Sequence, residues 1–254
     1  MRSFTQQMLR YRKTRKLLTP FISVMTKHTA IGLENIPSTG PLIIISNHRS
    51  DLDPLLISSF VRRGMMWVAA KFVFKIPFIS DFLKDLGTIP ISDDPKDQFA
   101  ATKQIAKALR DNRAVGIFPE GAEYILKNDF SRRCGNFNSG FAHFALKYKA
   151  NILPVSIIGI QEKVETWPVP DFIKSFFGIP QEVIKAKNRL QYKEVIVVFN
   201  KVININEFQN LDRSQGVNSI VLESKKRILE GIFSHGSTER RKNPKRQSGT
   251  RLEM

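Results

Sequence analysis

The stretch PLIIISNHRSDLDP, residues 41–54, decides how this chain folds. Its apolar run up to Ile45 is typical of a buried strand, and Asp53-Pro54 is typical of a helix start, with aspartate at the N-cap and proline at the first helical position. We therefore expect His48 in a loop between a strand and a helix, which is where open α/β sheets bind ligands. A loop of this length can fold the Asp53 carboxylate back onto the His48 imidazole, which gives a base with its orienting acid.

Strands and helices alternate along the rest of the chain. We expect strands at residues 41–46, 66–70, 88–91, 114–118, 152–158 and 194–202, and helices at residues 2–27, 54–63, 96–111, 138–149 and 214–231. This alternation predicts an α/β fold in which a mainly parallel central sheet is flanked by helices. We divide the chain into a basic helical segment (1–29), one α/β domain (30–235) and a basic, disordered tail (236–254).

The net charge of +17 indicates an anionic partner, either a membrane surface with anionic lipids or a nucleic acid. Residues 2–27 contain many cations and no acid, and their apolar residues recur at helical steps: Phe4, Met8, Tyr11, Leu18, Ile22 and Met25. This pattern favours an amphipathic helix in a membrane interface, and the alternative is a helix packed on the domain with a solvated basic face. Because no nucleic-acid-binding motif is present, we expect no nucleic acid partner.

No run of apolar residues approaches the length of about 20 that a spanning helix needs, so we expect peripheral or monotopic association. The chain has one cysteine, Cys134, and four histidines without the spacing of metal ligands. We therefore expect no internal disulfide and no metal site.

A second candidate motif, FPEG at residues 118–121, again follows a buried strand. Gly121 allows a ligand to approach the backbone closely, and the Glu120 carboxylate can accept hydrogen bonds from substrate hydroxyls. The alternative is an ordinary turn after a strand.

Four blocks of the chain resemble, in order and spacing, those of the glycerolipid acyltransferases, and the bacterial 1-acylglycerol-3-phosphate (lysophosphatidate) acyltransferases are the closest type. The blocks are His48-x4-Asp53, Gly87–Ile91, Phe118–Gly121 and Ile152–Val155. The resemblance covers about residues 30–205, so it makes the α/β domain an acyltransferase domain.

The resemblance implies acyl transfer from an acyl-carrier-protein or coenzyme A thioester to a hydroxyl of a lysophospholipid-type acceptor, in phospholipid biosynthesis. It implies no cofactor besides that thioester co-substrate, and a place on the cytoplasmic face of a membrane. In this family pattern His48 is the general base and Asp53 orients it. The substrate-binding positions are Glu120, Gly121, Lys71, Arg49 and Pro154. Backbone amides or Arg49 are candidates for stabilising the oxyanion.

The chain departs from the family pattern at two acceptor-binding positions. Family members usually carry arginine where Asp93 and Glu123 stand here, and two acids repel a phosphate dianion. Lys71 remains, and the cations that could compensate are Arg49, Lys75, Arg132 and Arg133. The departures suggest an acceptor with a zwitterionic, cationic or uncharged head, or a non-catalytic lipid-binding relative. The presence of both His48 and Asp53 argues against the second alternative.

Residues 161–190 are aromatic and interrupted by prolines, unlike the sequence around them. They could form a lid over an acyl chain or a loop that dips into a membrane. The alternative is a small satellite core under a long connection.

Overall fold

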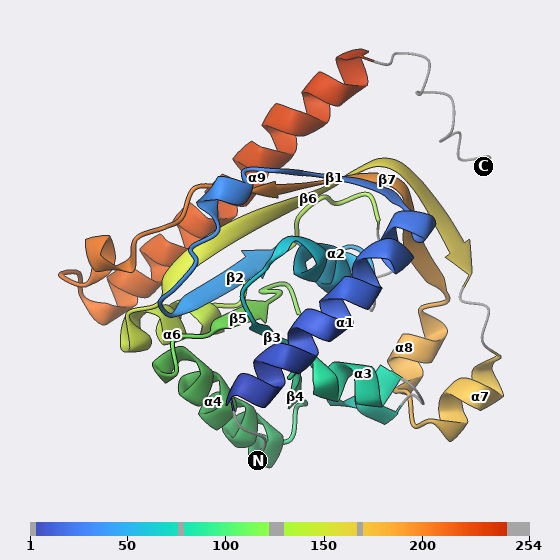
Figure 1. Ribbon diagram of the computed structural model, residues 1–254, viewed down its shortest axis with the longest axis horizontal. Helices are drawn as coiled ribbons and strands as arrows, with labels where there is room; N and C mark the ends of the chain where they lie inside the picture. Colours follow the sequence, from blue (N-terminus) through green and yellow to red (C-terminus); the bar gives the residue numbers. More distant parts are fainter. Residues whose placement is uncertain (1–3, 76–78, 122–129, 167–169, 243–254) are drawn as a thin grey trace.

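The sheet is built around β2 (Leu42–Ser46), the aliphatic run of the opening stretch. In the computed structural model, which describes residues 4–75, 79–121, 130–166 and 170–242, β2 is the middle strand of seven in the order β1-β7-β6-β2-β5-β3-β4. Five of the six neighbouring strand pairs are parallel, and only β6 and β7 pair antiparallel. The predicted α/β fold with a mainly parallel sheet flanked by helices is confirmed (Figure 1).

The predicted elements occur in the predicted order with some changes of length, and the structure adds one strand and several short helices that the sequence did not predict. The other strands are β1 (Lys27–Ile31), β3 (Met65–Ala70), β4 (Ile89–Ile91), β5 (Ala114–Ile117), β6 (Asn151–Thr166) and β7 (Asn188–Phe199). The helices are α1 (Phe4–Met25), α2 (Asp53–Phe60), α3 (Ile79–Asp85), α4 (Pro95–Arg110), α6 (Gly140–Tyr148), α7 (Asp171–Phe176), α8 (Gln181–Lys185) and α9 (Arg213–Lys242). Short 3-10 helices are η1 (Leu33–Asn35), η2 (Lys71–Lys75) and η3 (Ile205–Phe208).

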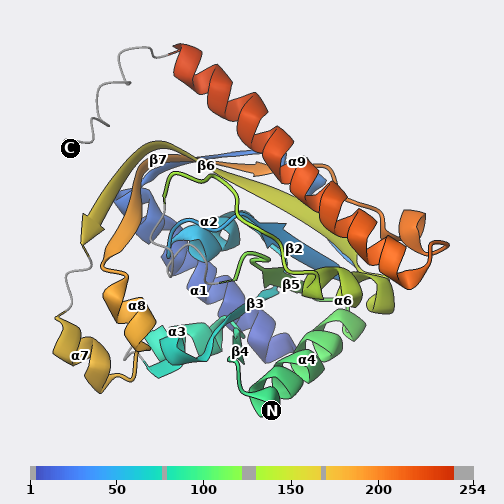
Figure 2. The same cartoon turned by 180° about the vertical axis from the view of Figure 1, so that it is seen from behind.

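Different helices cover the two faces of the sheet, as the front and rear views show (Figures 1 and 2). Side chains of a strand alternate between faces, so Ile43 and Ile45 enter the core formed with α4, α6 and α9, while Leu42 and Ile44 enter the core formed with α1 and α2. Burial on both faces explains why β2 is continuously apolar.

β6 and β7 are longer than the sequence predicted. Ser46, the last residue of β2, pairs with Val155, and β6 then continues past the end of β2 to Thr166. Over that extension it pairs with β7, from Ser156 opposite Val198 to Thr166 opposite Asn188. We call this antiparallel extension the β6–β7 arm, and it projects from the carboxyl edge of the sheet beside the loop that carries His48.

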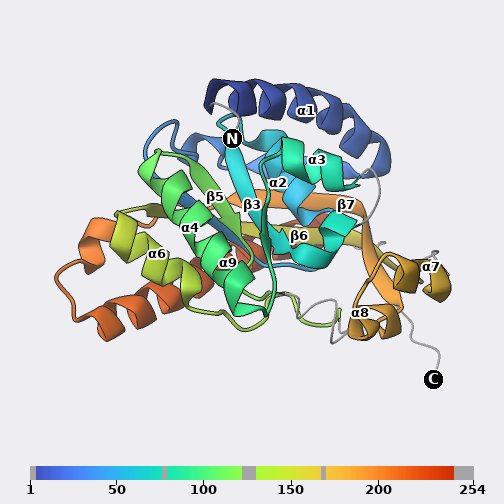
Figure 3. The same ribbon diagram turned by 90° about the horizontal axis from the view of Figure 1, so that it is seen from below.

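Part of the aromatic segment forms a satellite core at the end of this arm, where Figure 3 shows α7 and α8 close together. Ile179, Val183 and Ile184 pack with Phe72 and Phe177 in a cluster of their own. The outer side chains Phe172 and Phe176 of α7 are exposed. The alternative prediction of a small satellite core therefore fits the part of the segment that forms α8. Residues 167–169 of the segment lie outside the described residues.

The structure also differs from the predictions at α2, β1 and α9. α2 begins at Asp53 itself, and its N-cap is Leu52, because the Asp53 carboxylate binds the preceding loop instead of capping the helix. β1 was not predicted, because an edge strand that is exposed at alternate residues leaves little apolar signal. α9 continues to Lys242, so residues 236–242, expected in a disordered tail, are helical, and residues 243–254 lie outside the described residues.

Three residues of the apolar stripe predicted for α1 pack on the domain, whereas Met25 of that stripe is 48% exposed. Tyr11, Leu18 and Ile22 are buried against the face of the sheet that α2 also covers. A different set of apolar side chains, Leu17, Phe21 and Val24, points outward. Among the helices that the structure describes, none has both the length and the hydropathy of a bilayer span.

Gly231 sets how closely α9 approaches the sheet. A Cβ at this position would lie 2.6 Å from Oδ1 of Asn200 and would also overlap the hydroxyl of Ser156, which is buried and donates to the Ile228 carbonyl. We expect Gly231→Ala to lower the free energy of unfolding by about 1–3 kcal/mol, although alanine is otherwise the better helix residue. Denaturant unfolding measures this loss.

Gly140→Ala is the matched control, because nothing lies within 4 Å of the Cβ that this helical glycine would gain. It should leave stability unchanged or raise it by up to about 1 kcal/mol. Equal effects of the two substitutions would contradict the close packing of α9 on β6.

Candidate active site

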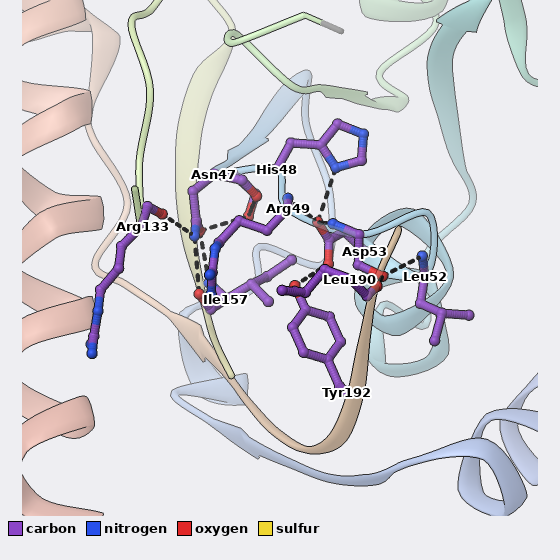
Figure 4. A network of polar contacts seen from close by, with 11 residues as sticks. Asn47, His48, Arg49, Leu52, Asp53, Arg133, Ile157, Leu190 and Tyr192 are labelled. Carbon is purple, nitrogen blue, oxygen red and sulfur yellow. Dashed lines mark hydrogen bonds and ion pairs between the residues drawn. The ribbon is translucent and has the colours of Figure 1, made fainter. Parts of the chain in front are cut away.

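The expected contact between His48 and Asp53 is present at the carboxyl end of β2 (Figure 4). Nδ1 of His48 lies 2.9 Å from Oδ2 of Asp53. An ionised carboxylate can only accept hydrogen bonds, so we assign the proton of this contact to Nδ1. That tautomer leaves Nε2 as the nitrogen that can take a proton from a hydroxyl group.

The Asp53 carboxylate is fully buried, with 0% of the residue exposed, and it accepts several hydrogen bonds. Besides the imidazole, Oδ2 accepts the backbone N–H groups of Arg49 at 2.7 Å and of Ser50 at 2.9 Å. Oδ1 accepts the hydroxyl of Tyr192 at 2.9 Å. A buried carboxylate that accepts several hydrogen bonds is stabilised in its charged form. The loop that these bonds close therefore holds an anion directly behind the imidazole.

An aromatic stack supports the other side of the imidazole ring. The His48 ring lies 3.8 Å from the ring of Phe118 at 15°, and Phe118 lies 4.8 Å from Trp67 at 8°. The Trp67 indole donates to the hydroxyl of Ser58 at 2.8 Å. Gly116 leaves room for the indole, since a Cβ there would lie within 2.7 Å of three of its ring atoms. Phe118 of the FPEG motif thus orients His48.

Glu120 is buried next to the same loop. The backbone amides of Gly135 and His48 donate to its carboxylate, and burial raises the pKa of Glu120 above its usual value. Its Oε1 is buried and accepts no hydrogen bond from the residues that the structure describes. Gly121 has φ +65°, a left-handed conformation that favours glycine, and its N–H closes a turn onto the Phe118 carbonyl at 3.0 Å. The FPEG segment is therefore a turn, and its Glu120 carboxylate also holds the His48 backbone by a hydrogen bond.

The Arg49 side chain is bound within the protein. Its guanidinium pairs with both carboxylate oxygens of Glu162 and donates to the Phe130 carbonyl at 2.7 Å. Gly159 leaves the space that the Glu162 carboxylate occupies. The predicted role of Arg49 in binding the acceptor stays a prediction, and it would require this ion pair to open.

Lys71 and Pro154 also have partners in the fold. The Lys71 ammonium lies 2.7 Å from the carboxylate of Asp97, which the hydroxyl of Ser92 also contacts. Pro154 pairs with Ile45 inside the sheet, and its carbonyl accepts the N–H of Asn200 at 3.0 Å. The substrate-binding roles of both residues stay predictions. Asp93 is exposed, whereas Ala122 and Glu123 lie outside the described residues.

Sequence reasoning missed Asn47 and Tyr192. The Asn47 amide donates to the carbonyls of Arg133 and Ile157, at 2.9 and 3.0 Å, and accepts the Ile157 N–H at 2.8 Å. A buried polar residue directly after an apolar strand was a signal for such a role. Tyr192 comes from β7, far along the chain, and no local pattern marks it.

Cys134 is unsuited to act as a nucleophile. Burial, and next the negative charge of Glu120, raise the pKa of the Cys134 thiol to about 12. A thiol needs a lowered pKa to be reactive near neutral pH. Among the described residues, no three His, Cys, Asp or Glu side chains are grouped so that they could hold a metal ion.

Comparisons with known proteins show the family of this chain. The family model described as Acyltransferase matches residues 27–158. The chain is 30% identical to the 1-acyl-sn-glycerol-3-phosphate acyltransferase of Helicobacter pylori over 70% of this chain and 68% of that protein. It is 27% identical to a probable 1-acyl-sn-glycerol-3-phosphate acyltransferase of Mycoplasma genitalium over 84% of this chain and 75% of that protein.

One solved structure shares the fold. It is the 1-acyl-sn-glycerophosphate (LPA) acyltransferase PlsC from Thermotoga maritima, with a TM-score of 0.60 and 18% identity. The match covers 89% of this chain and 79% of that one.

Proposed function

The chain belongs to the acyltransferase family, and from this premise we propose that it transfers a fatty acyl group from an acyl-carrier-protein or coenzyme A thioester to a hydroxyl of a lysophospholipid-type acceptor. The observation that carries the proposal is the contact of the His48 imidazole with the buried carboxylate of Asp53. A base with its orienting acid activates a hydroxyl, and here the hydroxyl belongs to the acceptor.

In the proposed reaction, Nε2 of His48 takes the proton of the acceptor hydroxyl as its oxygen attacks the thioester carbonyl. The tetrahedral intermediate then collapses, the carbon–sulfur bond breaks, and the imidazolium returns the proton to the leaving thiolate. Asp53 stays ionised throughout and stabilises the imidazolium. The products are an ester and a free thiol, so no serine or cysteine of the enzyme needs to be acylated.

The oxyanion of that intermediate requires donors near the thioester carbonyl. Arg49 was one candidate, but its guanidinium is bound to Glu162 and to a backbone carbonyl. This favours backbone amides of the site loops as the oxyanion donors.

We propose further that the acceptor head carries less negative charge than a phosphate monoester. The curated relatives act, by their names, on 1-acyl-sn-glycerol-3-phosphate. In this chain Asp93 stands where the family pattern has arginine, and the ammonium of Lys71 is already paired with Asp97. Burying a dianion beside carboxylates costs free energy that a zwitterionic or uncharged head does not require.

We also propose that the protein binds the cytoplasmic face of a membrane peripherally through the outer face of α1. The side chains of Leu17 and Val24 are 76% and 88% exposed, and they share this face with Phe21 and Lys13. Apolar side chains can enter the interface, while each lysine near an anionic leaflet contributes about 1 kcal/mol.

The catalytic assignment is tested by His48→Ala in an acyl-transfer assay with a radiolabelled acyl thioester. We expect the rate to fall by about 100- to 10,000-fold, because the acceptor hydroxyl loses its base. His143→Ala, which removes an exposed imidazole from α6, is the control and should keep the full rate. A normal rate in folded His48→Ala would favour a non-catalytic lipid-binding role.

The head-group proposal is tested by comparing acceptors with the same acyl chain. We expect lysophosphatidylcholine, lysophosphatidylethanolamine or monoacylglycerol to be acylated faster than lysophosphatidate, because Asp93 repels a dianion. Asp93→Arg should raise the rate with lysophosphatidate selectively. A strong preference of the unmodified protein for lysophosphatidate would contradict this proposal and leave the general acyl-transfer assignment intact.

Co-sedimentation with vesicles tests the membrane proposal. We expect binding to vesicles that contain anionic lipid, weaker binding at high salt, and reduced binding of the double variant Leu17→Gln, Val24→Gln. Leu222→Gln is the matched control, since Leu222 is 70% exposed on α9, away from α1. Binding to DNA in place of vesicles would support the nucleic-acid alternative.

A further inference from the structure

The loop that carries the His48–Asp53 pair is held along its length by the β6–β7 arm. Four of the five residues 49–53 each contact the arm. Two of these contacts are ion pairs, one is a hydrogen bond to a backbone carbonyl and one is a hydrogen bond from a phenol. The contacts are Arg49 with Glu162, Ser50 Oγ with the Leu190 carbonyl, Asp51 with Arg189, and Asp53 with Tyr192. Of these four contacts, only the last reaches a member of the pair itself.

The geometry of that contact is specific. Tyr192 is buried on β7, and its hydroxyl lies 2.9 Å from Oδ1 of Asp53. The other oxygen, Oδ2, receives its three donors from the loop and from His48. Within the described part of the chain, Tyr192 is therefore the residue that supplies a donor to Oδ1. Burial, and next the charge of Asp53, raise the pKa of Tyr192 well above its usual value, so the phenol remains a donor.

We propose that Tyr192 is a positioning residue of the acyl-transfer reaction. Its hydroxyl fixes the rotation of the Asp53 carboxylate and stabilises its negative charge, and in this way it sets the orientation of the His48 imidazole. This inference rests on the proposed function, because it assumes that His48 acts as the base. Tyr192 acts through Asp53 and does not itself contact the imidazole.

The chemistry of the phenol suits this role. A neutral donor stabilises the buried anion without cancelling its charge, so the carboxylate can still stabilise an imidazolium. Without that donor, Oδ1 would be a buried anionic oxygen with an unmet hydrogen bond, and the negative charge of the carboxylate would be balanced mainly on its Oδ2 side, which faces the imidazole. The charged groups that face the pair are Arg49 from the loop, Glu162 from β6 and Glu120 from the turn after β5.

The test compares Tyr192→Phe with Tyr11→Phe in the acyl-transfer assay, across a range of pH. Tyr11 is the matched control because it is also buried, but its hydroxyl donates to the Val61 carbonyl at 3.1 Å, outside the site. We expect Tyr192→Phe to lower kcat by roughly 10- to 100-fold while the KM for the acceptor changes by less than about threefold.

We expect the acidic limb of the kcat/KM profile to move to higher pH by up to about one unit in Tyr192→Phe. The reason is that a carboxylate with one donor fewer holds the imidazolium more strongly, so the base is freed only at higher pH. Tyr11→Phe should lower the melting temperature and keep both kcat and the position of the limb.

A second measurement does not depend on how well the phenylalanine variant folds. Fluorotyrosine placed at position 192 is nearly isosteric and a stronger donor, so it should move the acidic limb to lower pH. An unmoved limb in either the phenylalanine or the fluorotyrosine protein would overturn the proposal, as would a fall in kcat that Tyr11→Phe reproduces. Failure of the proposed function looks different, because the unmodified protein would then be inactive or His48→Ala would remain active.

Discussion

A buried negative charge is the constraint that the site depends on. The Asp53 carboxylate has no exposure to water, and an isolated ion in such a place would be costly. The fold offsets that cost with four donors at 2.7–2.9 Å, of which two are backbone amides of the loop, one is the His48 imidazole and one is the Tyr192 phenol. The loop conformation and the charge therefore stabilise each other, because closing the loop supplies the amides that the carboxylate needs.

The rest of the site holds the imidazole against this charge. Phe118 stacks on one face of the His48 ring, and Trp67 in turn stacks on Phe118. Trp67 lies on β3 and Phe118 directly follows β5, its neighbour in the sheet, so the spacing of these strands influences the spacing of the two rings. Glu120 braces the His48 backbone from the same side. Strand pairing thus helps to set the orientation of the His48 ring.

The β6–β7 arm connects the site to the outer surface of the protein. It leaves the carboxyl edge of the sheet, contacts four of the five residues 49–53, and leads to α7 and α8. α7 exposes Phe172 and Phe176 at its outer side.

The sequence alone determined the central strand, the position of His48 beyond its end and the return of Asp53 to the imidazole, because these depend on local spacing and on an apolar run. Phe118 and Glu120 were marked by their place after a second strand. Tyr192, Glu162 and the length of the arm could not be read in this way. Their contacts join residues far apart in the chain, and only the pairing of β7 with β6 brings them to the loop.

The same limit applies to α1. Its helical period and the stripe with Tyr11, Leu18 and Ile22 were plain in the sequence, but packing alone decided that this stripe would be buried on the domain while Leu17 and Val24 stayed outside. The periodicity of apolar residues predicts that a helix has an apolar face. Which surface covers that face is decided by the tertiary packing.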